Sequence, residues 1–296
     1  VASILSDIPQ ENLICEPEGR NTAPCIGLAA MRIMRRDPEG VMIVFPSDHY
    51  IRDEKGLRKA LMKGEEIARV GGSLVVLGVR PTRAETGYGY IEVGESIPPS
   101  RGDWVEVRQV RSFHEKPQAE KAEEFLRKGN YLWNSGIFIW NASTILKAIE
   151  RTLPELHEGL QRIEKAIGGP YERKTTKEVY SSLKPVSIDT GVLEKIRENL
   201  VVIPVDIGWS DVGSFISLSE VFDKDAQGNV VRAKHMGLKS SDNVIVGGKR
   251  LIATVGVQGM VIVETDDAVL VCAKECAQDV KTLVDELEKA GLKEYL

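Results

Sequence analysis

The sequence predicts an α/β domain followed by a small β-rich domain. Across residues 41–200, short β-rich apolar runs alternate with helical patterns, the arrangement that builds a parallel or mixed sheet. After about Phe222, closely spaced Val and Ile runs are punctuated by Gly or Asx, as in small β solenoids and barrels. We therefore divide the 296 residues into domains of 1–222 and 223–296, in keeping with a prior of roughly 150 residues per domain.

Apolar runs and periodicities predict the elements of the first domain. The run at 41–45 is expected to be a fully buried strand. Residues 104–113 alternate in period two, so one face of that strand should be solvated. Amphipathic helices are expected where apolar residues recur at three- and four-residue spacing. The other predicted strands are 73–79 and 201–205, and the predicted helical stretches are 55–70, 119–128, 142–150 and 156–183.

Short strands and one closing helix are predicted for the second domain. A polar, Gly-bearing linker at 223–228 opens it. Residues 277–290 form an amphipathic helical pattern with Gly291 just past its end. The predicted strands are only two or three residues long and lie at 230–231, 244–246, 251–252, 261–263 and 269–271.

Composition excludes several classes of protein. Lys and Arg number 39 against 44 Asp and Glu, a formal charge of −5, so the chain lacks the cationic excess of a general nucleic-acid binder. The longest apolar runs are far below the ~18 residues needed to cross a bilayer, and no secretory leader opens the sequence. We therefore expect a cytoplasmic protein without nucleic-acid or membrane partners. The four scattered cysteines are expected to be free thiols.

Two aspartates at predicted strand ends are candidate metal ligands. Asp48 follows the strand at 41–45, at the carboxyl edge of a sheet where open α/β folds bind ligands. Asp211 lies in a Gly-flanked turn after another strand. Two carboxylates suit a hard cation such as Mg²⁺ when phosphate oxygens and water complete its octahedron. From spacing alone, a helix-capping Asp48 and a turn-forming Asp211 remain alternatives, and His49 is expected to be structural.

Three further segments place polar groups beside apolar strands. The glycines at two-residue spacing in 86–91 let a ligand approach the backbone, although a bulge or hairpin explains them equally well. Glu115 beside Lys116 could hold a sugar hydroxyl and a phosphate, or form a solvated pair. Residues 133–136 offer an amide and a hydroxyl beside an aromatic ring, which suits sugar recognition or a turn.

Taken together and in this order, these segments resemble the sugar-1-phosphate nucleotidylyltransferases, and most closely the mannose-1-phosphate guanylyltransferases of the bacterial type. The sharpest similarity is EPEGRNTAP at 16–24. The other similar segments are PSDH at 46–49, TGYGYI at 86–91, EKP at 115–117, WNSG at 133–136, GWSDVGS at 208–214 and QDVK at 278–281. The resemblance spans nearly the whole chain. It implies a Rossmann-like nucleotidyltransferase domain followed by a short left-handed β-helix.

The resemblance also implies roles for individual residues. Asp48 and Asp211 resemble the family's Mg²⁺-binding pair, so Mg²⁺ is the implied cofactor. Lys116 would approach the sugar phosphate and act with the two aspartates in catalysis. The residues implied to bind the nucleotide are Asn21, Thr22 and Asp48. The residues implied to bind the sugar are Gly89, Glu115, Asn134 and Asp189.

The reaction that the resemblance implies is nucleotidyl transfer. A phosphate oxygen of mannose 1-phosphate attacks the α-phosphorus of GTP in line, giving GDP-mannose and pyrophosphate. The alternatives are a transferase for another sugar 1-phosphate or base, and a non-catalytic homologue that binds a sugar nucleotide. A homodimer is expected, because the apolar, Gly-punctuated strands of the second domain could supply an interface.

The sequence departs from the family pattern in two places. Thr190 and Gly191 follow Asp189, where the family usually has an aromatic and a small apolar residue. The family's glycine-rich loop, with its Arg and Lys, should precede Val1, and nothing in residues 1–12 resembles it. We therefore expect the start of the first domain to be absent from this chain, and we do not expect turnover by these residues alone. No cupin-like region follows, which favours a monofunctional enzyme.

Overall fold

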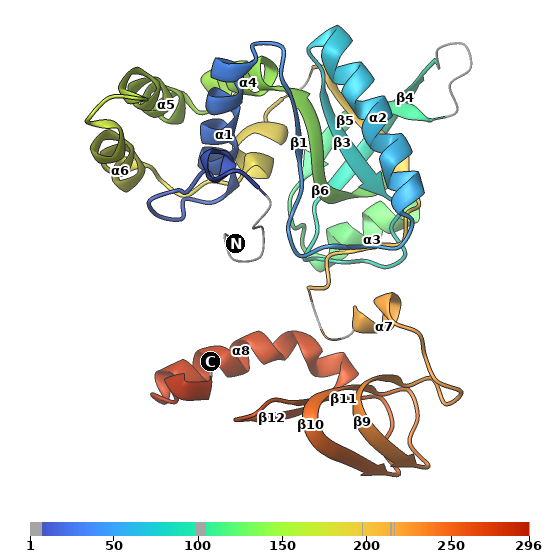
Figure 1. The fold of residues 1–296 in the computed structure, drawn as a ribbon. Coiled ribbons are helices and arrows are strands. Elements are labelled where there is room, and N and C mark those ends of the chain that lie inside the picture. Colours follow the sequence, from blue (N-terminus) through green and yellow to red (C-terminus); the bar gives the residue numbers. More distant parts are fainter. Residues whose placement is uncertain (1–7, 99–104, 197, 214, 216, 296) are drawn as a thin grey trace. The chain divides into compact units, whose positions relative to one another are not determined.

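The computed structural model describes residues 8–98, 105–196, 198–213, 215 and 217–295. Contacts divide the chain into two units (Figure 1). The first unit is Val1–Pro46 with Glu54–Ile207, and the second unit is Ser47–Asp53 with Gly208–Leu296. By this division residues 208–222 group with the β-rich part of the chain. The sequence boundary between residues 222 and 223 stays a prediction.

A six-stranded mixed sheet forms the centre of the first unit. The strand order is β1-β6-β3-β7-β5-β4, and β3 and β7 run parallel. Val75, Val76 and Leu77 of β3 are completely buried, and burying each such side chain contributes about 1.5–3 kcal/mol. The strands are β1 (Val41–Val44), β3 (Leu74–Val79), β4 (Tyr90–Ile97), β5 (Val107–His114), β6 (Tyr131–Asn141) and β7 (Leu200–Val205).

Five of these strands form a closed ring. β6 is long enough to pair with β3 between Trp133 and Ile139 and with β4 through its first three residues, 131–133. Because β3 also pairs with β7, β7 with β5 and β5 with β4, the circuit β6-β3-β7-β5-β4 returns to β6. Inside it, a Cβ at Gly78 would lie 2.7 Å from both Leu132 and Val202. A larger residue at this position would force one or both of those side chains to shift.

Helices cover both faces of the sheet. Figure 1 shows α1, α4, α5 and α6 gathered on one side and α2 on the other. α3 ends where the sequence predicts, at Gly129, whose φ of 69° lets its N–H reach Phe125 O. The helices are α1 (Thr22–Arg36), α2 (Glu54–Gly71), α3 (Ala119–Lys128), α4 (Ala142–Thr152), α5 (Pro154–Ala166) and α6 (Glu172–Ser182), with a short 3₁₀ turn η1 (Gln10–Asn12) and a π-helical turn η2 (Asp189–Leu193).

The structure corrects two predictions in the first unit. The strand at 41–45 is not fully buried: Ile43 is 40% and Phe45 is 45% exposed, because β1 is an edge strand of the described sheet, with β6 as its neighbour. The helical stretch at 156–183 is two helices, α5 and α6, separated by a turn in which Gly168 has a φ of 78°. The predicted strand at 104–113 begins at Val107, and Trp104 lies outside the described residues.

The second unit is built on parallel strands stacked in register. β9 pairs parallel with β10, β10 pairs parallel with β11, and β12 closes the sheet antiparallel. Val230, Val244 and Val261 align in register and form the apolar centre. The elements are β2 (Tyr50–Ile51), β8 (Trp209–Ser210), α7 (Leu218–Val221), β9 (Val230–Leu238), β10 (Val244–Val255), β11 (Met260–Glu264), β12 (Val269–Ala273), η3 (Lys274–Asp279), α8 (Val280–Lys289) and η4 (Lys293–Tyr295).

The strands of the second unit are longer than predicted. The runs at 244–246 and 251–252 belong to one strand, β10, whose register with β9 shifts between them. The break in the apolar pattern therefore marks an irregularity within a strand and not a turn. The closing helix α8 begins at Val280, since the preceding residues of the predicted helix form η3. No helix within the described residues is long and apolar enough to cross a bilayer.

Candidate active site

The fold of the first unit brings together five of the residues singled out from the sequence, a group we call the sugar cluster. Gly89 immediately precedes β4, and Glu115 and Lys116 immediately follow β5. Asn134 lies in β6, and Asp189 begins η2. β4 pairs with both β5 and β6, so these strands carry their polar residues to one place.

Hydrogen bonds hold the cluster in a defined geometry. Asn134 Nδ2 donates to Asp189 Oδ1 at 2.9 Å, while Asn134 Oδ1 accepts from the backbone N–H of Gly136 at 3.0 Å. Asn134 N donates to Gly89 O at 2.8 Å. A Cβ added at Gly89 would lie 2.7 Å from Glu115 Oε2. The glycine therefore allows the carboxylate of Glu115 to lie against the β4 backbone.

Glu194 fixes the segment that carries Glu115 and Lys116. Its Oε1 accepts from the backbone N–H of Glu115 at 2.8 Å, and its own N–H donates to Asp189 O at 2.9 Å. Lys116 has a φ of 45°, a left-handed conformation that a residue with a side chain rarely adopts. Its Nζ lies 3.5 Å from Glu115 Oε1, and 65% of its side chain is exposed. Lys116 is thus anchored at its backbone with its ammonium group open to a ligand.

Burial changes the acidity of the two carboxylates in the sugar cluster. Burial raises the pKa of Glu115 above its ordinary value, and the carboxyl group of Asp189 adds to the rise, whereas the Lys116 ammonium opposes it. Burial likewise raises the pKa of Asp189, against hydrogen bonds from its own backbone and from Asn134. Partly desolvated carboxylates and an amide are strong partners for sugar hydroxyls, because hydrogen bonds to charged groups are about twice as strong as neutral ones.

The segment at 16–24 lies beside the start of η2. Thr22 Oγ1 accepts from the backbone N–H of Ile188 at 2.8 Å, one residue before Asp189. Asn21 has a φ of 68°, and its Oδ1 accepts from Thr22 N at 2.8 Å, which begins α1. Asn21 and Thr22, two of the three residues implied to bind the nucleotide, are therefore joined to the segment that carries Asp189.

The two candidate metal ligands belong to the second unit. β2 and β8 pair antiparallel, Tyr50 with Ser210, so Asp48 before β2 and Asp211 after β8 lie at the same end of this ladder. Asp48 is 81% exposed. Asp211 Oδ1 accepts from Gly213 N at 3.1 Å, as in an Asx turn. The last residue of this motif, Ser214, lies outside the described residues.

His49 packs within this ladder. Its Nδ1 accepts from Trp209 Nε1 at 3.1 Å, and the two rings meet edge to face with centroids 5.3 Å apart. This contact joins β2 to β8 and holds the ladder that carries the two aspartates.

The donor set of this ladder fits a hard divalent cation. No group of three or more His, Cys, Asp or Glu that could hold a metal occurs among the described residues. A pair of carboxylates is nevertheless the donor set that Mg²⁺ takes when substrate phosphates and waters supply its other ligands. Asp48 and Asp211 are thus suited to a metal that arrives with a nucleotide, and not to a closed structural site.

One residue of the site was not predicted from the sequence. Glu194 contacts the Glu115 backbone across 79 positions of sequence, and nothing in the local pattern of residues 189–196 marks it. Its only signal is its place one π-helical turn after Asp189, which is recognisable once the turn is known.

Comparison with known proteins identifies the class. A nucleotidyl transferase family matches residues 3–228, and the chain belongs to this family. A second family, described as the MannoseP isomerase/GMP-like beta-helix domain, matches residues 233–287. The predicted order of a nucleotidyltransferase domain and a β-helix-like domain is confirmed.

The individual relatives carry more specific names than the family. The mannose-1-phosphate guanylyltransferase of Salmonella muenchen is 39% identical over 96% of this chain and 59% of that protein. The protein of the same name from Escherichia coli K12 is 36% identical over 96% of this chain and 59% of that protein. A crystal structure described as mannose-1-phosphate geranyltransferase from Thermus thermophilus has a TM-score of 0.81 and 37% identity, over 93% of this chain and 78% of that one. The chain spans about three-fifths of the length of the curated relatives it matches.

Proposed function

We propose that this chain forms the nucleotidyltransferase part of a mannose-1-phosphate guanylyltransferase, which transfers GMP from GTP to mannose 1-phosphate and releases pyrophosphate. The observation that carries the proposal is the sugar cluster, in which two partly buried carboxylates, an amide and an exposed ammonium group converge on one place. The names of the relatives support the choice of guanine and mannose.

The carboxylates and the amide orient the sugar. Glu115 and Asp189 accept hydrogen bonds from sugar hydroxyls, and Asn134 is held by its bond to Asp189 in the orientation that leaves one Nδ2 hydrogen available. A ligand held by several such bonds loses its rotational freedom before the reaction, so the phosphate is already aimed at its target.

Lys116 holds the phosphate of the sugar. Its ammonium projects from a backbone fixed by Glu194, beside the carboxylate of Glu115. The phosphate oxygen attacks the α-phosphorus of the nucleotide in line, the bond to the β-phosphate oxygen breaks, and pyrophosphate leaves with the electron pair. The two reactants are both anions, so a fixed cation offsets their repulsion and the charge that grows at the α-phosphate.

Asp48 and Asp211 are the residues that would hold a divalent cation. Nucleotidyl transferases of this family generally use such an ion, and we propose Mg²⁺. When bound, it supplies a positive charge to the nucleotide phosphates. Asn21 and Thr22, whose own hydrogen bonds shape the start of α1 and its link to Ile188, are proposed to bind the nucleotide.

Pyrophosphate release with different substrates, measured on the full-length protein that contains these residues, tests the reaction and its specificity. The rate of pyrophosphate release with GTP and mannose 1-phosphate is expected to exceed the rate with UTP, dTTP or ATP. It is also expected to exceed the rate with glucose 1-phosphate and any of these nucleotides. Lys116→Ala should reduce the rate by at least roughly tenfold, the effect of losing one charge-assisted contact. Lys177→Ala, which removes an exposed lysine of α6, is the matched control and should not change it.

Calorimetric titration with GDP-mannose separates the alternatives. Binding of GDP-mannose together with pyrophosphate release from GTP and mannose 1-phosphate in the separate assay supports the enzyme, and binding without such release favours a non-catalytic sugar-nucleotide-binding protein. A preference for another base or sugar favours a different transferase of the same class. Absence of both binding and release would contradict the proposal.

Asp211→Asn tests the metal assignment. The substitution keeps the size of the side chain and removes its charge, so the Mg²⁺ concentration for half-maximal activity should rise by at least about tenfold. Asp206→Asn, which changes a neighbouring aspartate outside the ladder, should leave it unchanged. Equal Mg²⁺ dependence of Asp211→Asn and the unmodified chain would refute the assignment. The homodimer and the cytoplasmic location stay predictions.

A further inference from the structure

A pocket of about 300 Å³ opens at one end of the five-stranded ring. Four strands of the ring and the residue after the fifth contribute to its lining: Pro204 belongs to β7, Arg108 to β5, Val93 to β4 and Leu132 to β6, and Arg80 follows β3. The pocket is therefore the mouth of the ring, and we call it the ring mouth. Its volume is at the lower end of the range for small-molecule sites, which are frequently found in the mouths of β-barrels.

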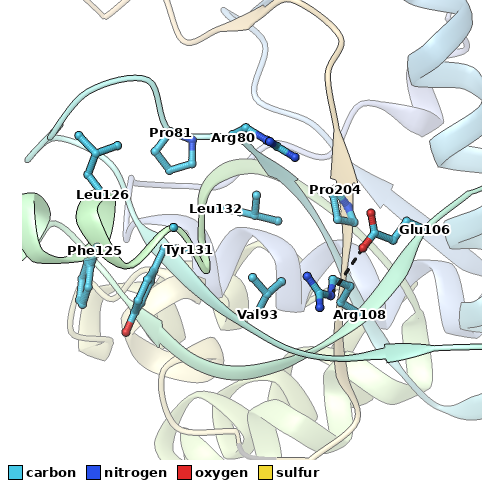
Figure 2. A pocket seen from close by; sticks show the side chains of 11 residues that line it. Arg80, Pro81, Val93, Glu106, Arg108, Phe125, Leu126, Tyr131, Leu132 and Pro204 are labelled. Atoms are coloured by element: carbon cyan, nitrogen blue, oxygen red, sulfur yellow. Dashed lines mark ion pairs between the residues drawn. The ribbon is translucent and has the colours of Figure 1, made fainter.

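The ring mouth combines an apolar floor with a cationic side. Figure 2 shows Val93 and Leu132 between the aromatic ring of Tyr131 on one side and the guanidinium groups of Arg80 and Arg108 on the other. Val93 and Leu132 are each 8% exposed and Tyr131 is 5% exposed. An occupant would therefore meet an apolar surface below and two cations at the side.

The two guanidinium groups have donors to spare. Arg108 forms an ion pair with Glu106, whose Oε1 lies 3.6 Å from Arg108 Nε. That distance is too long for a hydrogen bond, and the buried Nε has no hydrogen-bond partner within the described residues. Arg80 is exposed and makes no ion pair with the part of the chain that the structure describes. Each guanidinium presents five N–H donors in a planar fork that matches phosphate oxygens.

We propose that the ring mouth binds a small organic phosphate, whose phosphate group is held by Arg80 and Arg108 and whose flat or apolar body rests on Val93 and Leu132. None of these four residues belongs to the sugar cluster or to the aspartate pair, so the proposal is independent of the proposed function. A phosphate monoester fits better than a carboxylate, because it offers three acceptor oxygens to the two forks.

Phenyl phosphate is the probe that combines both features. Titrated into the 296-residue chain and followed by calorimetry, it should bind with a dissociation constant on the order of 1 mM or below. Inorganic phosphate, which lacks the ring, phenol, which lacks the charge, and benzoate, which has one acceptor fewer, should all bind more weakly. Equal binding of phenyl phosphate and inorganic phosphate would contradict the role of the apolar floor.

Variants locate the binding. Arg80→Gln and Arg108→Gln should each lower the affinity for phenyl phosphate by about tenfold, the effect of losing one charge-assisted contact. The matched control Arg127→Gln removes an exposed arginine of α3 that does not line the pocket, and it should have no effect. Circular dichroism verifies that each variant is folded, and the exposed position of Arg80 keeps one variant usable if Arg108→Gln is not.

Substitutions of Glu106 and Lys116 supply two further tests of phenyl phosphate binding. Glu106→Gln should tighten binding several-fold, because it removes a carboxylate that competes with the phosphate for Arg108. Lys116→Ala should leave it unchanged, whereas a loss would place the phenyl phosphate in the sugar cluster. The proposal would be overturned by loss of phenyl phosphate binding in Lys116→Ala or by a weakening in Arg127→Gln equal to that in the ring-mouth variants. Absence of phenyl phosphate binding at about 10 mM would also overturn it.

Discussion

Gly89→Ala is expected to disable the sugar cluster, and Gly87→Ala, two residues earlier in the same turn, is not. A Cβ added at Gly89 would lie 2.7 Å from Glu115 Oε2 and 3.2 Å from Asn134 Cβ. A Cβ added at Gly87 would meet only Glu85, at 3.3 Å from its Oε1. Gly89 is buried and Gly87 is exposed. The two substitutions therefore make the same chemical change with different consequences.

The size of the effect follows from the first distance. To reach an ordinary contact of about 3.4 Å with the new Cβ, Glu115 Oε2 must retreat by about 0.7 Å. A hydrogen bond of ~2.8 Å from a sugar hydroxyl to that oxygen would then lengthen to ~3.5 Å, beyond the useful range. Losing one hydrogen bond to a charged group costs about 1.5–3 kcal/mol. The affinity for the sugar nucleotide should therefore fall roughly 10- to 150-fold.

Calorimetric titration of the unmodified chain and both variants with GDP-mannose measures this loss. Urea denaturation of the same samples shows whether Gly89→Ala also lowers the free energy of unfolding, for which we expect about 1–3 kcal/mol from overpacking. The reasoning is refuted if Gly89→Ala binds as tightly as the unmodified chain. It is also refuted if Gly87→Ala loses as much affinity as Gly89→Ala.

Two further predictions concern stability. Because the pKa of Asp189 is raised in the folded chain, folding retains a proton there, and the free energy of unfolding should decline as the pH rises from about 4 through that pKa. Asp189→Asn removes this decline, so urea midpoints of the variant should fall less between about pH 4 and 7 than those of the unmodified chain; parallel curves would count against it. Asn243, which is fully buried, donates to Val257 O and accepts from Met260 N. Asn243→Ala should therefore lower the free energy of unfolding of the second unit by about 2–4 kcal/mol, against no change for the exposed Gln258→Ala, and an unchanged thermal midpoint would disprove this role.

Elements with a local signature were predictable. The helix α3 is recognisable from its apolar spacing and its terminal Gly129, and β3 from a run of apolar residues interrupted only by Gly78. Both outcomes depend on residues within a few positions of one another. The strands that pair with a given strand are distant from it in the sequence, so its place in the sheet has no local signature. For this reason the predicted burial of β1 is too high: its composition is that of a central strand, but it lies at an edge of the sheet.

Part of the chemistry of the site is predictable because it depends on local sequence. The residue types and motifs at 46–49, 115–117 and 208–214 are set in the sequence and indicate carboxylates and an ammonium group at strand ends. The grouping of these residues in space is not set by the local sequence. Asp48 and Asp211 come to one end of a ladder only because β2 pairs with β8. Glu194 was missed because its partner is the backbone of Glu115, and a backbone N–H has no sequence signature.

Residue order alone therefore establishes the class of the domains, the identity of the polar groups and most of the local elements, since these depend on neighbours in the chain. Tertiary structure decides which strand lies at an edge, which residues of distant segments meet, and that five strands close into a ring with a cationic mouth. Strand pairing is the physical reason, because it depends on hydrogen bonds between backbones that are alike at every position, so composition cannot specify the partner.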